Sequence, residues 1–218
     1  MRRRSTFWKY RIGVDLSDGS HDHSAVAVIE ASVDESLENL TDGVGKPLLH
    51  EIIALRRFDL TYKPEHIEDE LLVFLEHPLF QGSKTIMVVE TNSIGGRVFR
   101  SLSSRGLSVD RLMGVEVTGG HTEGVMSGGI KPVPKQNLVQ PLRRAVELGS
   151  LKAREGLTWW PAMREELVHY QARKTASGRL SYGNDETRTA HDDLVMAAAH
   201  AWYAGTQLGS SRELRVVR

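Results

Sequence analysis

The pattern of apolar and polar positions divides the chain into an N-terminal group of strands and a longer region of alternating helices and strands. Apolar runs joined by short polar connections predict three early strands at residues 10–16, 24–30 and 48–58. Connections this short favour antiparallel pairing. From residue 64 onward helical and strand patterns alternate, which is typical of parallel pairing. The pattern therefore predicts an α/β domain with a mixed sheet.

The later elements follow from the same periodicities. We expect helices at 64–77, 95–105, 134–147, 157–174 and 191–206, strands at 85–90 and 112–117, and a small hairpin at 178–183. The run at 85–90 is too short for a helix and too apolar for an exposed strand, which predicts a central strand. Residues 118–133 hold five glycines and few apolar anchors, which predicts a mobile loop over a cleft.

Acidic residues stand at the ends of these apolar runs. Asp15 ends the first strand, Glu90 ends the central strand, and Asp192 with Asp193 opens the last helix. Carboxylates at the C-terminal ends of buried strands emerge at the edge where α/β sheets usually place their sites. Gathered there they would repel one another unless cations shared them, and hard oxygen ligands suit Mg²⁺ or Mn²⁺. The pattern predicts a metal-dependent enzyme acting on phosphate esters, with two ions about 4 Å apart.

Each acidic position also has a simpler interpretation. Asp15 is compatible with a residue that stabilises the following turn, and Glu90 with a cap for the helix near Gly95. The aspartate pair suits the positive end of a helix dipole, although this explains one aspartate better than two.

Three neighbouring residues are candidates for a supporting role. His191 precedes the aspartate pair and suits a helix cap, a metal ligand or a contact to the scissile phosphate. Asp22 and His23 follow the first strand and are candidates to support the ligands, or are simply solvated.

Length and composition exclude several classes of protein. The 218 residues suit a single domain with its core at about 10–206. Lys+Arg and Asp+Glu both total 28, which argues against a purely electrostatic nucleic-acid coat but permits a local basic groove. The lack of cysteine excludes a disulfide framework and a cysteine nucleophile. No apolar stretch approaches the roughly 18 residues of a membrane span, so a cytoplasmic protein without membrane association is expected.

Basic residues near the acidic positions are candidates for contacts to DNA phosphates. Lys131 and Lys135 flank the glycine-rich segment, Arg97 follows Glu90, and Arg143 lies on the next helix. Such contacts would position a duplex without reading its sequence. The simpler alternative for each is a solvated surface charge.

Three motifs together resemble a known family. They are Ile12-Gly13-Val14-Asp15 followed by Asp22-His23-Ser24-Ala25-Val26; Val88-Val89-Glu90-Thr91-Asn92-Ser93-Ile94-Gly95; and Thr189-Ala190-His191-Asp192-Asp193-Leu194-Val195-Met196-Ala197. In this order they resemble the nuclease domain of the large terminase subunit of tailed phages, a RuvC-like branch of the RNase H-like superfamily. The resemblance extends over most of residues 10–206, and the last motif is its most specific part.

The resemblance implies an RNase H-like fold with a central five-stranded mixed sheet flanked by helices. It also implies metal-dependent cleavage of double-stranded DNA during genome packaging in the host cytoplasm, with an ATPase motor domain, a portal and a small terminase subunit as partners. It places the acidic triad at Asp15, Glu90 and one of Asp192 or Asp193. The sequence contains no phosphate-binding loop of the Gly-x-x-x-x-Gly-Lys-Ser/Thr type, so we expect no ATPase domain in this chain.

Two other functions compete with this interpretation. One is a RuvC-like resolvase, an enzyme of the same superfamily that selects branched DNA. The other is a non-catalytic packaging module that docks on a portal or partner protein. Comparing the cleavage of branched and linear duplexes would distinguish the resolvase from a terminase nuclease. A chain that neither cleaves DNA nor binds metal would indicate the docking module.

Overall fold

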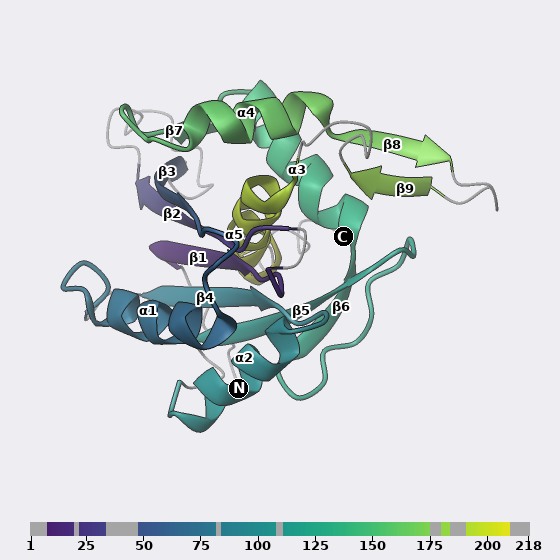
Figure 1. Cartoon of the computed structure of the whole chain (residues 1–218). Helices are drawn as coiled ribbons and strands as arrows, with labels where there is room; N and C mark the ends of the chain where they lie inside the picture. Colours follow the sequence, from purple (N-terminus) through teal and green to yellow (C-terminus); the bar gives the residue numbers. More distant parts are fainter. Residues whose placement is uncertain are drawn as a thin grey trace, which may run out of the picture.

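The computed structural model describes residues 8–19, 22–33, 48–81, 84–107, 111–174, 180–183 and 191–209. These residues form a mixed sheet with helices on both of its faces (Figure 1). No helix among them is long and apolar enough to cross a membrane.

Within the described ranges, the central sheet has seven strands in the order β6-β5-β4-β1-β2-β3-β7. Strand β1 pairs antiparallel with β2, which pairs antiparallel with β3, while β1, β4, β5 and β6 run parallel. The predicted mixed sheet and its antiparallel N-terminal part are thus confirmed. The bounds are β1 Tyr10–Asp15, β2 Ala25–Val33, β3 Leu48–Arg57, β4 Thr85–Glu90, β5 Leu112–Thr118, β6 Ile130–Pro134 and β7 Leu151–Ala153.

The expected count of five strands is wrong because each edge of the sheet carries one more. Strand β6 lies within the segment predicted to be a mobile loop, and its two prolines concealed it. Proline is tolerated at a sheet edge, where one side of the strand needs no ladder hydrogen bonds, and β6 is such an edge strand. Gly128 and Gly129 have positive φ angles and make the turn into β6. Strand β7 has three residues, too few for a recognisable alternation.

In the part of the chain that the structure describes, five helices cover the two faces of the sheet. Helices α1 (Pro64–Glu76) and α2 (Gly95–Ser104) pack on one face, and α3 (Lys135–Glu147), α4 (Trp160–His169) and α5 (Asp193–Gly209) on the other (Figure 1). Residues 194–204 of α5 are buried on all sides, since α5 lies between the sheet and the helices α3 and α4. Trp159 and Trp160 pack partly buried against this core.

The helix predicted at 157–174 is shorter than expected. Pro161 marks its first turn, and the helix ends at His169, after which Tyr170 is extended. Residues Gln171–Lys174 form strand β8, which pairs with β9 (Leu180–Gly183). Residues 178 and 179 of the predicted hairpin lie outside the described part of the chain.

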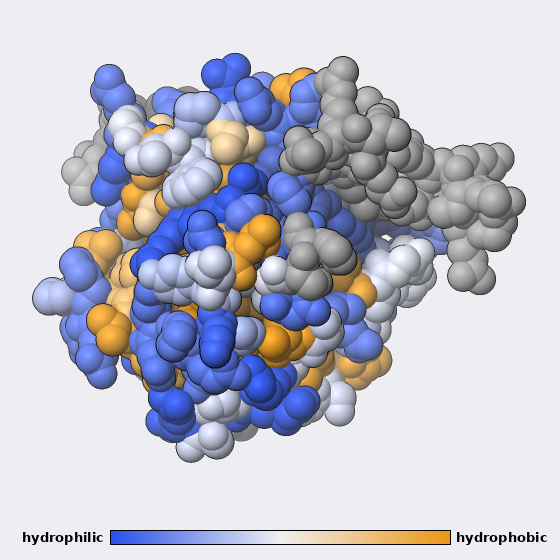
Figure 2. Space-filling view, viewed as in Figure 1, coloured by the Kyte–Doolittle hydropathy of each residue, from blue (hydrophilic) through white to orange (hydrophobic). Residues whose placement is uncertain are grey.

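The surface facing the viewer is mainly hydrophilic. Figure 2 shows apolar residues on this face in several separate patches between larger hydrophilic areas.

Two features of the fold bring the predicted acidic positions together. Strands β1 and β4 are parallel neighbours with Val14 opposite Val89, so Asp15 and Glu90 leave the sheet side by side. Helix α5 crosses β1 at Gly13, where an added Cβ would lie 1.9 Å from the Ala197 carbonyl oxygen. This close approach places the first residues of α5 at the same end of the sheet.

Candidate active site

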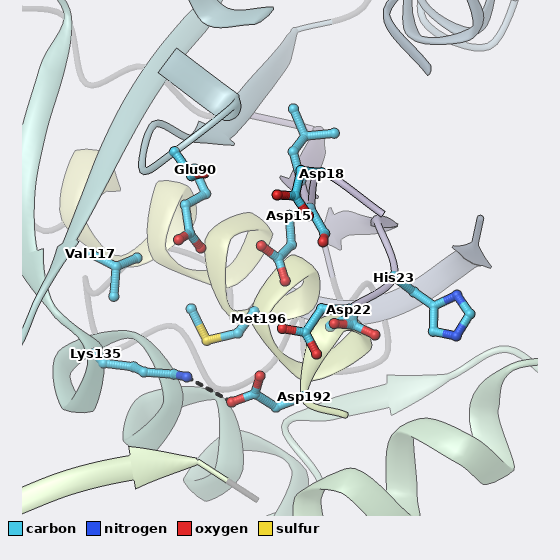
Figure 3. Close-up of a pocket in the computed structure, with 13 residues that line it drawn as sticks. Asp15, Asp18, Asp22, His23, Glu90, Val117, Lys135, Asp192 and Met196 are labelled. Carbon is cyan, nitrogen blue, oxygen red and sulfur yellow. Dashed lines mark hydrogen bonds and ion pairs between the residues drawn. The ribbon is translucent and has the colours of Figure 1, made fainter. Parts of the chain in front are cut away.

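A cavity of about 330 Å³ opens at the C-terminal ends of β1 and β4. Figure 3 shows carboxylates from the two strands, from the segment after β1 and from the start of α5 around it. Its lining residues are Asp15, Leu16, Ser17, Asp18, Asp22, His23, Glu90, Ser93, Val117, Lys135, Asp192, Asp193 and Met196. All four predicted acidic positions therefore line one cavity.

Asp15 stands at the end of β1 among the other carboxyl groups of this cavity. Burial raises its pKa well above the ordinary value, and the charges of Glu90, Asp193 and Asp192 raise it further. Asp15 also shares a hydrogen bond with Glu90. Without a cation, Asp15 thus keeps its proton and Glu90 accepts the hydrogen bond.

Glu90 receives its main support from a buried histidine. His200 is fully buried on α5, and its Nε2 lies 3.1 Å from Glu90 Oε2. The ring donates through Nε2, because a carboxylate can only accept. Burial would raise the pKa of Glu90, but the hydrogen bond and charge of His200, with Asp15 and Lys135, hold it below its usual value. The alternative role of Glu90 as a helix cap is wrong, since α2 has no side-chain cap.

The two aspartates at the start of α5 have different surroundings. Asp192 Oδ2 lies 2.7 Å from Lys135 Nζ, as the dashed line in Figure 3 marks. Asp193 is 3% exposed, and its Oδ2 lies 3.6 Å from Arg57 Nε. This oxygen has no hydrogen-bond partner among the described residues. Burial raises the pKa of Asp193 to about 7, although the charge of Arg57 opposes this.

A buried glutamate from α4 supports both Arg57 and α5. Glu166 accepts a hydrogen bond from Arg57 and, through Oε2, another from the Val195 backbone N–H at 2.9 Å. Burial nevertheless raises the pKa of Glu166 to about 8, against the effects of Val195 and Arg57. The guanidinium of Arg57 also lies over the Trp159 ring, 5.5 Å from its centroid.

One group of side chains has the ligand spacing of a metal site. Asp22, His191 and Asp193 offer ligand atoms that all lie within 4.8 Å of one another. His191 Nδ1 lies 3.0 Å from Asp22 Oδ1. His23 also lines the cavity but offers its ring to other partners: its Nδ1 lies 2.8 Å from the Phe58 carbonyl oxygen, and the ring packs edge-to-face against the His191 ring, with centroids 5.2 Å apart.

The four basic residues predicted to contact DNA are separated by the fold. Only Lys135 lines the cavity. Lys131 Nζ lies 2.6 Å from Glu123, Arg97 lies 2.6 Å from Glu65, and Arg143 lies 2.8 Å from Glu147. Arg97 and Arg143 are half-exposed and remain accessible to a large ligand.

Sequence reasoning missed three residues of this site: His200, Arg57 and Glu166. His200 had a signal, since it interrupts an apolar helix seven residues after Asp193 and so lies near the same helix face. Arg57 and Glu166 had none, because these two residues contact each other although they are 109 residues apart in the sequence. Thr189 and Ala190 of the third motif lie outside the described residues.

The mixed sheet with its flanking helices is an RNase H-like fold. No protein-family model matches the sequence, and no curated protein matches it. Solved structures do match. The large terminase nuclease from the thermophilic phage G20c is 19% identical, covering 93% of this chain and 90% of that chain with a TM-score of 0.57. Its cobalt-bound form is 20% identical over 93% of this chain and 89% of that chain, with a TM-score of 0.59.

A second phage protein gives the same result. The large terminase nuclease domain of Thermus phage P74-26 is 18% identical, over 88% of this chain and 77% of that chain, with a TM-score of 0.52. At these identities the likeness establishes the fold. The chain therefore has the fold of large terminase nuclease domains.

Proposed function

We propose that this chain is a divalent-metal-dependent endonuclease that cleaves double-stranded DNA during viral genome packaging. The observation that carries the proposal is the convergence of Asp15, Glu90, Asp192 and Asp193 on one cavity, in a fold shared with large terminase nucleases. The cavity lies at the carboxyl ends of parallel strands, where such sheets usually bind their ligands.

The side chains present fit divalent cations. Carboxylate oxygens with one imidazole suit Mg²⁺ or Mn²⁺, and forms of the phage G20c nuclease are known with bound cobalt and with bound magnesium. Burial first, and then the neighbouring charges of Glu90, Asp193 and Asp192, raise the pKa of Asp15, and a bound cation would offset these charges.

We assign the residues to two cation positions. Glu90 and Asp192 would hold one ion, and Asp22, His191 and Asp193 the other. Asp15 lies between these two groups of ligands and would contribute its carboxylate to the same site, since its charge interacts with those of Glu90 and Asp193. In this assignment Asp193 is the principal ligand of the pair, while Asp192 shares its charge with Lys135. Two ions in such a site activate water and stabilise the leaving oxygen of an in-line displacement.

The chain's own residues prepare the site for this chemistry. His200 keeps Glu90 ionised by donating to Oε2, so this ligand needs no proton removed before a cation binds. The Lys135 ammonium group lies at the cavity and is placed to contact a phosphate oxygen of the backbone. Arg97 and Arg143 are half-exposed candidates for further phosphate contacts.

The proposal is tested by incubating the purified chain with supercoiled plasmid and Mn²⁺ or Mg²⁺. We expect nicked and linear products, and their loss when EDTA is added. Equal amounts of linear and four-way-junction DNA in parallel reactions separate the two nucleases, since preference for the junction would indicate a resolvase. A chain that cleaves neither DNA and releases no heat on titration with Mn²⁺ would be a docking module.

The biological setting follows from the same proposal. Double-stranded DNA is the substrate, and an ATPase motor domain, a portal and a small terminase subunit are the expected partners. The reaction would take place in the cytoplasm of an infected host.

A further inference from the structure

At the N-terminus of helix α5, the N-cap residue does not supply the side chain that caps the helix. Asp192 is the N-cap, because its carbonyl oxygen accepts the first helical hydrogen bond, from the Met196 N–H at 2.8 Å. An aspartate at this position normally turns its side chain back to accept a hydrogen bond from the second or third helical N–H. Here the third N–H, that of Val195, donates instead to Glu166 of helix α4. The Asp192 carboxylate points into the cavity towards Lys135.

The same glutamate also binds Arg57, the basic residue beside Asp193. Glu166 Oε1 binds a terminal nitrogen of Arg57, whose Nε lies 3.6 Å from Asp193 Oδ2. That separation is an ion pair but exceeds a hydrogen bond. Because Glu166 shares the guanidinium, Asp193 keeps a charge partner and retains an oxygen without a hydrogen bond among the described residues.

We propose that Glu166 is a positioning residue that caps α5 from a neighbouring helix and thereby leaves the Asp192 and Asp193 carboxylates available to the cavity. A buried helical N–H needs an acceptor. If Glu166 is removed, the Asp192 side chain is a suitable acceptor because it stands at the N-cap, and it would turn away from Lys135 to cap its own helix. The inference rests on the proposed function in one respect only, that these carboxylates bind cations.

Three substitutions of Glu166 distinguish its hydrogen bond to the Val195 N–H from its charge interaction with Arg57. Glu166→Met keeps the volume and removes the acceptor, and Glu166→Ala removes both. Glu166→Gln retains an oxygen that can accept from Val195 but carries no charge for Arg57. Glu165→Ala is the matched control, because Glu165 is the exposed neighbour on α4. The methionine variant decides the outcome if the alanine variant fails to fold.

Metal-free crystal structures test the positioning directly. In Glu166→Met we expect an Asp192 carboxylate oxygen about 3 Å from the Val195 nitrogen and no Asp192–Lys135 ion pair. In Glu166→Gln and in the control, Asp192 stays on Lys135. An Asp192 carboxylate that remains on Lys135 in both the methionine and alanine variants would overturn the proposal.

Calorimetric titration with Mn²⁺ in the absence of DNA tests the consequence. We expect binding about tenfold weaker or more in Glu166→Met, the range found when residues supporting metal ligands are removed. Glu166→Gln should bind more tightly than Glu166→Met, and Glu165→Ala like the wild type. If Glu166→Met has a lower melting temperature but unchanged Mn²⁺ affinity, Glu166 is only structural. If the wild type itself binds no Mn²⁺, the proposed function fails, and the crystal structures still decide the role of Glu166.

Discussion

His200 is the residue that sets the ionisation of Glu90. It is fully buried, and its Nε2 donates to Glu90 Oε2 while its Nδ1 has no hydrogen-bond partner among the described residues. A buried histidine with one committed nitrogen cannot easily be replaced by another side chain. Its position on α5 also couples Glu90 to the helix that carries Asp193.

Replacement of His200 by alanine should shift the pH dependence of cleavage. Without the hydrogen bond and charge of His200, burial dominates and the pKa of Glu90 rises. The variant then needs a higher pH to ionise Glu90, so its pH–rate profile moves to the alkaline side. We expect activity roughly tenfold lower or more at about pH 6, with partial recovery at about pH 8.

The control for this prediction is His66→Ala, which removes an exposed histidine of α1. Its profile should match the wild type. A His200→Ala profile of unchanged shape, even at reduced activity, would show that His200 does not govern the protonation of Glu90.

The ligands of the site could be predicted from the sequence, but the contacts that support them could not. Asp15 and Glu90 end apolar strands, and this local pattern is visible in a single sequence. The two aspartates open a helix, and the spacing alone left their roles open. The structure distinguishes the two aspartates by their basic neighbours. Lys135 binds Asp192, and Arg57 lies beside Asp193. Both contacts join distant parts of the chain, so no local pattern reports them.

At the scale of elements, the contact between α5 and β1 positions the whole site. The two elements meet at Gly13, where the absence of a side chain lets the backbone of α5 approach the strand. Because Asp15 follows Gly13 by two residues and Asp193 precedes Ala197 by four, a change in this spacing moves both carboxylates.

Gly13→Ala should therefore destabilise the fold and weaken metal binding together. The added Cβ would lie 1.9 Å from the Ala197 carbonyl oxygen, and this backbone atom cannot move without shifting α5. We expect the free energy of unfolding to fall by about 2–3 kcal/mol, as for other overpacked cores. Urea denaturation measures this change, and calorimetry with Mn²⁺ measures the affinity.

Gly119→Ala is the matched control, since nothing lies within 4 Å of a Cβ added there. It should leave both quantities close to those of the wild type. Equal stabilities of the two variants would mean that α5 does not lie as close to β1 as described.

Most elements could be predicted because their patterns are long and regular. The strand Thr85–Glu90 agrees with its prediction at both ends, and α1, α2 and α3 differ from theirs by one residue at one end. The failures have physical causes. Strand β6 contains two prolines that an edge position tolerates, and β8 follows α4 after a single extended residue, where helical and strand patterns merge.

At the scale of the molecule, the acidic site should weaken the metal-free fold as the pH rises. Burial raises the pKa of Asp193 to about 7, whereas an unfolded chain releases this proton near pH 4. Between about pH 6.5 and pH 8 the folded state thus binds more of this proton than the unfolded state, so stability falls by up to about 1.4 kcal/mol per pH unit. His50, whose pKa is lowered to about 4, acts only below this window.

Urea denaturation across this window, with and without Mn²⁺, measures the effect. Mn²⁺ should restore stability, and more strongly at the higher pH, because cations compete with protons for the same oxygens. Stability that rises steadily with pH in the metal-free protein would contradict the assignment of buried, protonated carboxyl groups.

The most direct test of the whole account is Mn²⁺-dependent nicking of supercoiled plasmid by the Asp15→Asn variant. The substituted amide would keep the shape of the protonated Asp15 side chain and could donate the same hydrogen bond to Glu90, so the variant should fold as stably as the wild type. Asp69→Asn, which changes an exposed carboxylate on α1, is the control. The account predicts that Asp15→Asn is folded and does not nick the plasmid while the control cleaves like the wild type; undiminished nicking by Asp15→Asn would contradict it.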